Sequence, residues 1–201
     1  MTRVRLSVPE RREELLGAAV EVIEQRGVAA LRVADVARAL GVSSALVIYH
    51  FETKEKLVAA AFAHAAAADL ARLGELLDVP GSAQDRLREA VRWYSPTGLA
   101  KGWRLWIEGW AVALREPTLR EVSEHLDRQW QAALTRVICE GVAAGEFDCP
   151  DPGPAAERLT ALLDGLAVRM TVHPNLLARE AMESWIEQAL VRELRFGEPT
   201  Q

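Results

Sequence analysis

The sequence predicts an all-α protein of about nine helices. Apolar residues recur at helical spacing along nearly the whole chain, and no segment alternates apolar and polar residues over the length of a strand. Gly and Pro stand at the breaks between these periodic segments. Half of the 201 residues are apolar, which allows a substantial core.

Capping signals bound the first four helices. Gly27 and Gly41 each follow a periodic segment and are expected to end it, because Gly reaches the left-handed backbone conformation at little cost. Ser43 and Thr53 are suitable N-caps for the segments that follow them. We therefore expect helices over residues 10–26, 33–40, 43–50 and 54–77.

Five further helices follow, and a Pro near each start suits a first helical turn. The breaks contain Val79-Pro80-Gly81-Ser82, Ser95-Pro96, Glu116-Pro117, the stretch from Gly145 to Pro154, and His173-Pro174. The expected helices cover residues 83–94, 98–114, 117–144, 154–172 and 175–196.

Composition narrows the classes of function. Cys139 and Cys149 are too few for a disulfide framework and lie outside metal-ligand spacing, so we expect no metal and no cofactor, and a reducing cytoplasm fits. We find neither a signal sequence nor an apolar run long enough to span a membrane. No Cys-His pairing, glycine-rich phosphate loop or carboxylate pair indicates an active site, so we do not expect an enzyme.

Charge is distributed unevenly along the chain. Residues 1–57 carry nine Lys and Arg against eight Asp and Glu, whereas residues 58–201 carry fifteen against twenty-one. This asymmetry suits a small DNA-binding end on a larger acidic body, although charged runs also form ordinary solvated faces. The N-terminal arm contains Arg3, Arg5, Arg11 and Arg12.

Residues 33–51 have the pattern of a helix-turn-helix. Gly41 supplies a tight turn after the first short helix, Val42 can plug between the two helices, and Ser43 starts the second. Two short helices joined in this way place the second helix in the DNA major groove. Other pairs of short helices share the pattern, so by itself it leaves DNA binding and plain packing both open.

Three stretches carry a resemblance to a known family. They are R-R-E-E-L-L-G-A-A-V-E-V-I-E-Q-R-G, V-A-D-V-A-R-A-L-G-V-S and Y-H-F-E-T-K-E-K-L-V. With these stretches, residues 11–62 resemble the N-terminal domain of TetR-family transcriptional regulators. The resemblance implies an all-α homodimer, usually a repressor, whose three N-terminal helices bind operator DNA and whose larger domain holds a small-molecule pocket.

The resemblance also assigns roles to individual residues. Tyr49 and His50 match an aromatic pair that contacts phosphates or braces the recognition helix, and Lys54 matches a phosphate-binding Lys. Val47 and Phe51 are expected in the core, and a partly buried brace is the alternative role for Tyr49. The full set expected at DNA is Arg32, Ser43, Ser44, Ala45, Leu46, Ile48, Tyr49, His50 and Lys54.

Three residues depart from the family pattern. Leu46 and Ile48 stand where Thr and Tyr are frequent, and Arg32 stands where Ser or Thr often caps the second helix. Apolar side chains can still contact thymine methyl groups in the major groove. Arg32 could meet a phosphate, and the arginine-rich arm could enter the minor groove or remain a solvated tail.

Tryptophans mark a candidate ligand pocket in the second half. Trp103, Trp106 and Trp110 recur on one helical face, and an aromatic pocket could take a flat or cationic ligand. The alternative is that these residues are core, and that His173 only caps a helix. The stretch from 106 to 147 also looks like a TetR subgroup that includes choline-responsive repressors. The candidate ligand-binding residues are Trp93, Tyr94, Trp103, Trp106, Glu108, Trp110, Met170 and His173.

The last two expected helices carry apolar stripes that suit a dimer interface. The family resemblance implies a four-helix bundle made from these two helices of each chain, with Gly165 allowing close approach. The alternative is that the stripes form core within one chain. The expected interface residues are Leu159, Leu162, Leu163, Gly165, Leu166, Trp185, Ile186, Ala189 and Leu190.

These observations predict two domains and one leading function. Residues 1–55 form the helix-turn-helix domain, and residues 56–201 form the ligand-binding and dimerisation domain. The leading hypothesis is a homodimeric cytoplasmic repressor that a small-molecule effector releases from operator DNA. The alternative is a dimeric DNA-binding regulator without an effector. An open cavity near Trp103–Trp110 would favour the first hypothesis, and a filled core there would favour the second.

Overall fold

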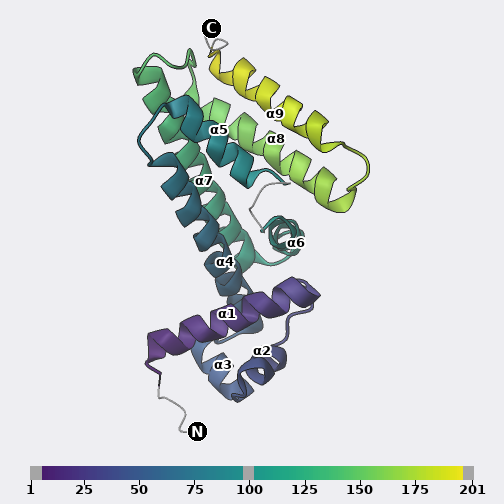
Figure 1. Ribbon diagram of the computed structural model, residues 1–201. Helices are drawn as coiled ribbons and strands as arrows, with labels where there is room; N and C mark the ends of the chain where they lie inside the picture. Colours follow the sequence, from purple (N-terminus) through teal and green to yellow (C-terminus); the bar gives the residue numbers. More distant parts are fainter. Residues whose placement is uncertain (1–5, 97–101, 197–201) are drawn as a thin grey trace. The chain divides into compact units, whose positions relative to one another are not determined.

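The computed structural model describes residues 6–96 and 102–196, and over these ranges it contains nine α-helices and no strand (Figure 1). This confirms the predicted all-α fold. The expected arm residues Arg3 and Arg5 lie outside the described residues. The helices are α1 (Val8–Arg26), α2 (Val33–Leu40), α3 (Ser44–Phe51), α4 (Lys54–Leu77), α5 (Ala83–Tyr94), α6 (Trp103–Ala113), α7 (Pro117–Ala143), α8 (Pro152–Val172) and α9 (Arg179–Leu194).

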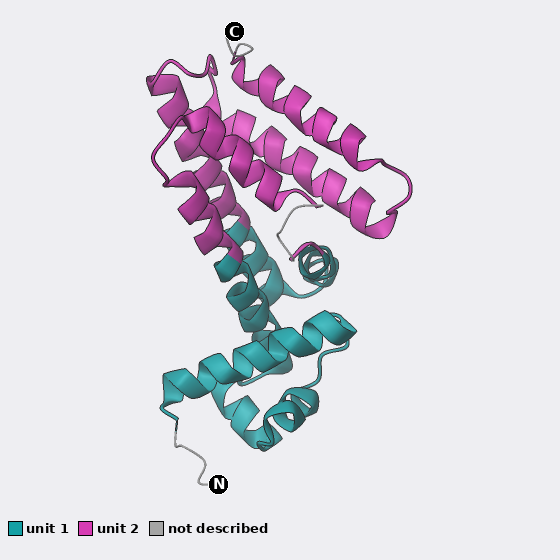
Figure 2. Cartoon of the chain, viewed as in Figure 1, with its two compact units in different colours: residues 1–68, 104–126 teal, residues 69–103, 127–201 magenta. Residues whose placement is uncertain are grey.

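The chain divides into two compact units (Figure 2). Unit 1 comprises residues 1–68 and 104–126, and unit 2 comprises residues 69–103 and 127–201. Helices α4, α6 and α7 therefore each contribute residues to both units. The predicted domain boundary at residue 55 falls inside unit 1, which continues along α4 to residue 68 and also includes most of α6 and the start of α7.

The local signals that bound the first helices are present. Gly27 ends α1 with φ +87°, and Gly41 ends α2 in the left-handed conformation with φ +60° and ψ +38°. The Ser43 hydroxyl accepts a hydrogen bond from the Leu46 amide at 3.2 Å, which caps α3. The Thr53 hydroxyl accepts from the Lys56 amide at 3.2 Å and does the same for α4.

One of the later helices begins further along the chain than predicted. Helix α9 begins at Arg179 rather than 175, so Pro174 lies in the connection before it. Helix α6 is described from Trp103, and its predicted start at 98 lies outside the described residues. Pro117 and Pro152 do stand at the first positions of α7 and α8, where the missing amide proton leaves no helical hydrogen bond unmade.

Unit 1 packs the three N-terminal helices around one core, and α1 lies across α2 and α3 (Figure 1). Arg12 of α1 reaches α3: its guanidinium lies 4.4 Å from the centre of the Phe51 ring and donates to the His50 carbonyl oxygen at 2.8 Å. Helix α3 is thus fixed by packing and by polar contacts. The buried core residues are Leu15, Leu16, Ala19, Val22, Ile23, Val36, Ala37, Val47 and Phe51.

Unit 2 contains the helical hairpin of α8 and α9, which lie side by side (Figure 1). The Arg158 guanidinium on α8 donates to the Glu193 carboxylate on α9 at 2.9 Å. The Asp148 amide donates to the Leu194 carbonyl oxygen at 2.9 Å, which holds the C-terminal end of α9.

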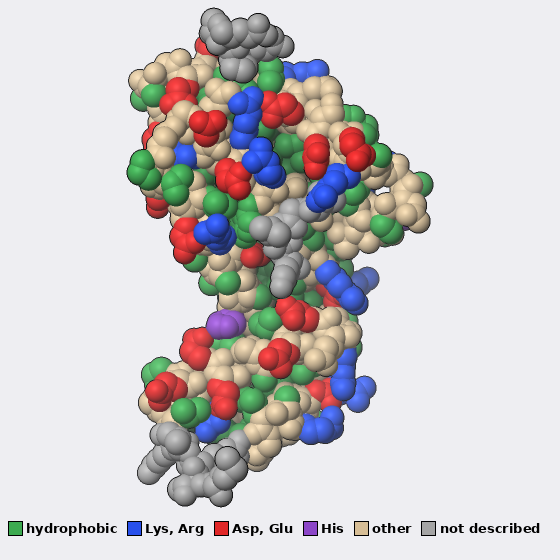
Figure 3. Space-filling model, viewed as in Figure 1, with side chains coloured by type: hydrophobic (Ala, Val, Ile, Leu, Met, Phe, Trp, Pro, Cys, Tyr) green, Lys and Arg blue, Asp and Glu red, His purple; other side chains and the backbone are tan. Residues whose placement is uncertain are grey.

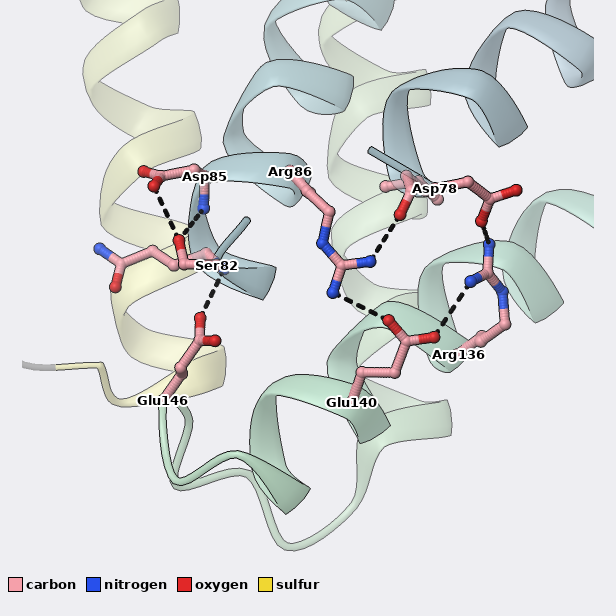
Figure 4. A network of polar contacts seen from close by, with 9 residues as sticks. Asp78, Ser82, Asp85, Arg86, Arg136, Glu140 and Glu146 are labelled. Atoms are coloured by element: carbon pink, nitrogen blue, oxygen red, sulfur yellow. Dashed lines mark hydrogen bonds and ion pairs between the residues drawn. The ribbon is translucent and has the colours of Figure 1, made fainter. Parts of the chain in front are cut away.

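A polar network joins α5 and α7 to the end of α4 in unit 2 (Figure 4). Arg86 of α5 donates to the Leu77 carbonyl oxygen at 2.6 Å and forms an ion pair with Glu140 of α7 at 2.9 Å. Arg136 of α7 pairs with Glu140 at 3.0 Å and with Asp78 at 2.7 Å. Arg86, and to a smaller extent Arg136, holds the pKa of Glu140 below its ordinary value.

Helix α4 is long and apolar enough to cross a membrane by length and composition alone, contrary to the expectation from sequence. A core helix of a globular protein passes the same test. Leu57, Val58, Ala61 and Phe62 are buried within unit 1, so packing accounts for much of this apolar character.

Gly141 and Gly74 are a matched pair of helical glycines in unit 2. A Cβ at Gly141 would lie 2.3 Å from the Phe147 ring, whereas a Cβ at Gly74 would meet nothing within 4 Å. We expect Gly141→Ala to lower the free energy of unfolding by about 1–3 kcal/mol through overpacking. Gly74→Ala should raise it by about 0.5–1 kcal/mol, because Ala favours a helix. Denaturant titration measures both, and a stabilising Gly141→Ala would contradict the packing described here.

Candidate functional site

Helix α3 carries a continuous exposed face. Ser44, Ala45, Ile48 and Tyr49 are exposed at helical spacing, while Val47 on the other side is fully buried. Tyr49 is 73% exposed, so it is not the partly buried brace that was its alternative role. The helix therefore offers hydroxyl, methyl and phenol groups to an approaching surface, as the sequence predicts for a recognition helix.

Two of the predicted base-reading residues are also used within the protein. The Ser43 oxygen accepts from the Leu46 amide, so Ser43 caps the helix and one of its two acceptor lone pairs is already used. Leu46 is half-buried, which leaves only part of its side chain available. The exposed residues Ser44, Ala45, Ile48 and Tyr49 are therefore more accessible candidates for base contact than Ser43 and Leu46.

Several groups of unit 1 are candidates for phosphate binding. Lys54 is exposed at the start of α4, and its Nζ donates to the Ala29 carbonyl oxygen at 3.4 Å. Arg32 is exposed at the N-cap position of α2 and makes no side-chain capping bond. The rings of Tyr49 and His50 meet edge to face at 5.3 Å. These groups lie in the same unit as α3, which is what phosphate contacts beside a recognition helix require.

His50 lies in positive surroundings. Partial burial, and after it the charges of Arg12 and Arg11, lower the pKa of His50 below its ordinary value. On the face seen in Figure 3, basic side chains gather along one edge of unit 1 while acidic side chains are interspersed across it. A phosphate beside His50 would reverse the effect of the arginines and favour the charged imidazole.

Helix α3 ends on a strained residue. Glu52 has φ +64° and ψ −53°, and the Thr53 amide donates to the Phe51 carbonyl oxygen at 2.7 Å around it. This is a γ-turn with positive φ, which is rare for a residue with a side chain. The turn reverses the chain within two residues, so that Lys54 starts α4 directly after the recognition helix.

An aromatic cluster forms in unit 2. Tyr94 lies 4.5 Å from Trp103 and 4.2 Å from Trp130 between ring centres, and Trp93 stacks on Trp130 at 6.5 Å. The Trp103 indole nitrogen donates to the Tyr94 carbonyl oxygen at 2.8 Å. The Trp130 indole nitrogen is buried and finds no acceptor among the described residues. The cluster thus contains three of the predicted ligand-binding residues and one, Trp130, that was not predicted.

Three carboxylates act on this cluster. Burial, and beyond it the charges of Asp164, Asp69 and Asp127, raise the pKa of Tyr94. Burial, and then Asp127, raise the pKa of Asp164 to about 7. Within the described ranges neither Asp69 nor Asp164 forms an ion pair or a side-chain hydrogen bond. Among the described residues of unit 2, no cation forms an ion pair with Asp69 or Asp164, and Arg128 only moderates the raised pKa of Asp127.

The cluster is closely packed. The cavity bordered by Tyr94, Trp130, Thr160 and Leu163 measures only ≈ 10 Å³, which is less than a ligand needs. In the described part of the chain, no group of three His, Cys, Asp or Glu side chains could hold a metal ion.

The other predicted ligand-binding residues are placed differently. Trp106 is buried against Phe62, with ring centres 4.9 Å apart, and Trp110 borders a surface hollow of ≈ 280 Å³ in unit 1. The Glu108 carboxylate accepts from the Val28 amide at 2.7 Å, so it is used inside the protein. On α8, Met170 is half-buried and exposed His173 occupies the C-cap position.

The predicted dimer residues fall into two groups. Leu159, Leu163, Leu166, Ile186 and Leu190 are buried within the chain, as the alternative interpretation of the stripes required. The others remain accessible, and Trp185 is 45% exposed. Accessible apolar or small residues on α8 and α9 are Leu162, Gly165, Val168, Val172, Trp185, Ala189 and Val191.

Several residues of these sites were not predicted. Asp69 and Asp127 stand in helical segments where a single acidic residue usually marks a solvated face. Asp164 did leave a signal, because it interrupts the apolar run A-L-L-D-G-L. Trp130 has no local sequence signal, since its partners lie far away in the chain. Arg12 was expected in the N-terminal arm, but it lies in α1 and packs on Phe51.

Two family models match the chain. The model for bacterial regulatory proteins of the tetR family covers residues 15–61, and the model for the C-terminal part of BetI-type transcriptional repressors covers residues 83–195. The chain belongs to the TetR family. The helix-turn-helix is therefore the DNA-binding part of a transcriptional regulator.

Relatives and solved structures agree with this assignment. The HTH-type transcriptional regulator BetI of Pseudomonas paraeruginosa is 27% identical over 80% of this chain and 81% of its own. A TetR-family regulator from Rhodococcus sp. is 31% identical, with a TM-score of 0.77 over 92% of this chain and 99% of that one. A regulator from Saccharomonospora viridis, solved in complex with choline, shares the fold at 24% identity, with a TM-score of 0.79 over 92% of this chain and 98% of that one.

Tyr49→Ala and Lys54→Ala should each weaken operator binding. Each change removes an exposed group next to α3, and the logarithmic salt slope should fall by about one for each phosphate that the variant no longer neutralises. Fluorescence anisotropy at several salt concentrations measures both quantities. Arg72→Ala, which removes an exposed charge from α4 in unit 2, is the control. Unchanged affinity and slope in both variants would show that these residues do not contact DNA.

Asp164→Asn should stabilise the protein more at pH 8 than at pH 5. The folded-state pKa of Asp164 is raised to about 7, so the unfolded chain loses this proton first and stability declines as the pH rises towards 7. Removing the charge should add roughly 1–3 kcal/mol at pH 8. Thermal unfolding at both pH values measures this, with exposed Asp148→Asn as the control. A loss of stability at both pH values would contradict the assignment.

Proposed function

We propose that this TetR-family regulator is a homodimeric repressor that leaves its operator when a small organic cation binds in unit 2. The observation that carries operator binding is the exposed face of α3, which presents Ser44, Ala45, Ile48 and Tyr49 beside exposed basic groups. An effector and repression are typical of the family; the chemistry of the cluster around Tyr94 supports the class of effector.

In this proposal the α3 face reads DNA through a small set of contacts. Ser44 can donate to base edges, while Ala45 and Ile48 contact thymine methyl groups. Tyr49, Lys54 and Arg32 bind phosphates, and His50 joins them when it is charged. So few polar contacts give modest discrimination per half-site, and a dimer that binds two half-sites multiplies it.

The accessible stripe on α8 and α9 supports the dimer. A Cβ at Gly165 would meet nothing within 4 Å in the described chain, so packing inside one chain does not explain a glycine in the middle of α8. A second chain that approaches closely at this point does explain it, because Gly lets helix backbones come together. Trp185, 45% exposed on α9, adds a large apolar surface that association would cover.

The carboxylates and rings of unit 2 support a cationic effector. Half-buried charges without partners are costly, and a bound cation would offset that cost for Asp69 and Asp164. Trp and Tyr faces attract organic cations through their ring quadrupoles. Choline, which is bound in the Saccharomonospora viridis neighbour, is a cation of this class; at that identity the likeness itself extends to the fold only.

Close packing of the cluster implies that the effector binds another conformation. A cavity of ≈ 10 Å³ cannot admit an organic cation, so Tyr94 and Trp130 must move apart to make room. An effector that binds only this opened state draws the population towards it. If the opened state holds the DNA-binding helices differently, the same shift releases the operator.

Buried Trp103 and Trp106 favour a second candidate function. Both side chains are at most 5% exposed and fill the protein interior, as expected for a dimeric regulator that binds DNA without any effector. Both candidates share operator binding and a cytoplasmic location, where the chain would meet chromosomal DNA. Neither candidate requires catalysis or a cofactor.

Choline and its neutral isostere 3,3-dimethyl-1-butanol distinguish the two candidates. An operator is first selected in vitro with the wild-type protein, and its affinity is then measured by fluorescence anisotropy at constant ionic strength. Millimolar choline should weaken operator binding at least fivefold, the neutral isostere should not, and Asp164→Asn should reduce the choline effect. Operator binding that neither choline nor tetramethylammonium changes would support the effector-independent regulator. A wild-type protein that selects no sequence would contradict both candidates.

A further inference from the structure

The turn between α1 and α2 is held by a side chain from α6. Helix α1 ends at Arg26, and after Gly27 the amide of Val28 no longer points along the helical ladder. Val28 is only 1% exposed, so its amide needs a partner inside the protein. The Glu108 Oε2 atom is that partner, at 2.7 Å.

Gly27 fits closely under this carboxylate. A Cβ at Gly27 would lie 2.6 Å from Glu108 Oε2, which is closer than a Cβ atom approaches another heavy atom. The backbone there has φ +87°, a conformation that favours glycine. The turn and the carboxylate therefore match one another in shape as well as in hydrogen bonding.

Helix α6 fixes Glu108 from its own side. Arg104 Nε donates to the other carboxylate oxygen, Oε1, at 2.9 Å, which orients the group. On the same helix, a Cβ at Gly109 would lie 2.5 Å from the Phe62 ring of α4, and Trp106 meets that ring edge to face. Helix α6 is thus pressed against α4, and Glu108 transmits its position to the turn.

The turn also positions two candidate DNA contacts. The Ala29 carbonyl oxygen accepts from Lys54 Nζ at 3.4 Å, and Arg32 stands at the N-cap of α2. Leu31, between them, is fully buried and anchors the turn in the core. A displacement of the Val28 amide therefore reaches Lys54, Arg32 and the start of α2 without passing through any other helix.

We propose that Glu108 is a positioning residue for operator binding, through which α6 sets the geometry of the α1–α2 turn. Glu108 does not touch DNA. It accepts a hydrogen bond from the Val28 amide and so fixes the turn, which contains Arg32 and whose Ala29 carbonyl oxygen binds Lys54. The proposal rests on operator binding and not on any effector. An effector that moved α6 would act through this same bond.

Two variants of Glu108 and one control separate positioning from stability. Glu108→Gln keeps an oxygen that can accept from Val28, whereas Glu108→Ala removes the acceptor. Glu121→Ala is the control, because Glu121 is an exposed carboxylate on α7 in the same unit. For each folded protein we compare the affinity for an operator selected with the wild type, its salt slope, and the hydrogen exchange rate of the Val28 amide.

Glu108→Ala should weaken operator binding at least tenfold and speed exchange of the Val28 amide at least tenfold. Its salt slope should also fall, because a displaced turn takes Lys54 and Arg32 away from the phosphates that they would neutralise. Glu108→Gln should stay within about threefold of the wild type in affinity, and Glu121→Ala should match it. The rescue by Gln identifies the bond to Val28, rather than the charge, as the cause.

Wild-type affinity in Glu108→Ala would overturn the proposal, whatever its thermal stability. Equal losses in the Gln and Ala variants would overturn it too, because they would assign the effect to charge. The exchange measurement needs no DNA. If the wild type selected no operator, the proposed function would be contradicted, and unchanged Val28 exchange in Glu108→Ala would separately overturn the role of Glu108.

Discussion

An eight-residue helix has too few internal hydrogen bonds to be stable in water, so the recognition helix depends on what it packs against. Val47 and Phe51 supply that support, since both are buried in the core of unit 1. Burial of two such side chains contributes roughly 1.5–3 kcal/mol each. Arg12 adds a bond to the His50 carbonyl and covers the Phe51 ring. The residues on the exposed face of α3 are therefore free to be chosen for DNA contact, because the residues on the opposite face stabilise the helix.

The connections before α2 and after α3 are fixed by specific contacts, as the helices themselves are. After α3, Glu52 adopts a strained γ-turn that brings α4 into place. Before α2, the Glu108 carboxylate accepts a hydrogen bond from the Val28 amide and packs closely against Gly27. Unit 2 contrasts with this, because Asp69 and Asp164 form no ion pair there within the described residues. In the proposed function, a bound organic cation would offset the cost of these half-buried carboxylates.

Local patterns predicted most of the fold, because caps and apolar periodicity are local properties. Gly41, Ser43 and Thr53 correctly predicted where their helices end or begin. Pro174 predicted the start of α9 too early, because Pro174 lies in the loop before that helix. The sites were harder to predict, because they depend on contacts between distant segments. Glu108 was expected near a ligand, but its partner is the Val28 amide, eighty residues earlier in the chain. Similarly, only the packed structure separates buried Leu163 from accessible Leu162 on α8.

The central claim is that two copies of the exposed α3 face bind successive major grooves. Hydroxyl-radical footprinting on a selected operator, with the mass of the complex measured by light scattering, tests it most directly. We expect protection with two-fold symmetry, half-sites about one helical turn or a multiple of it apart, and complexes that contain whole dimers. A single unsymmetrical footprint occupied by one chain would contradict it.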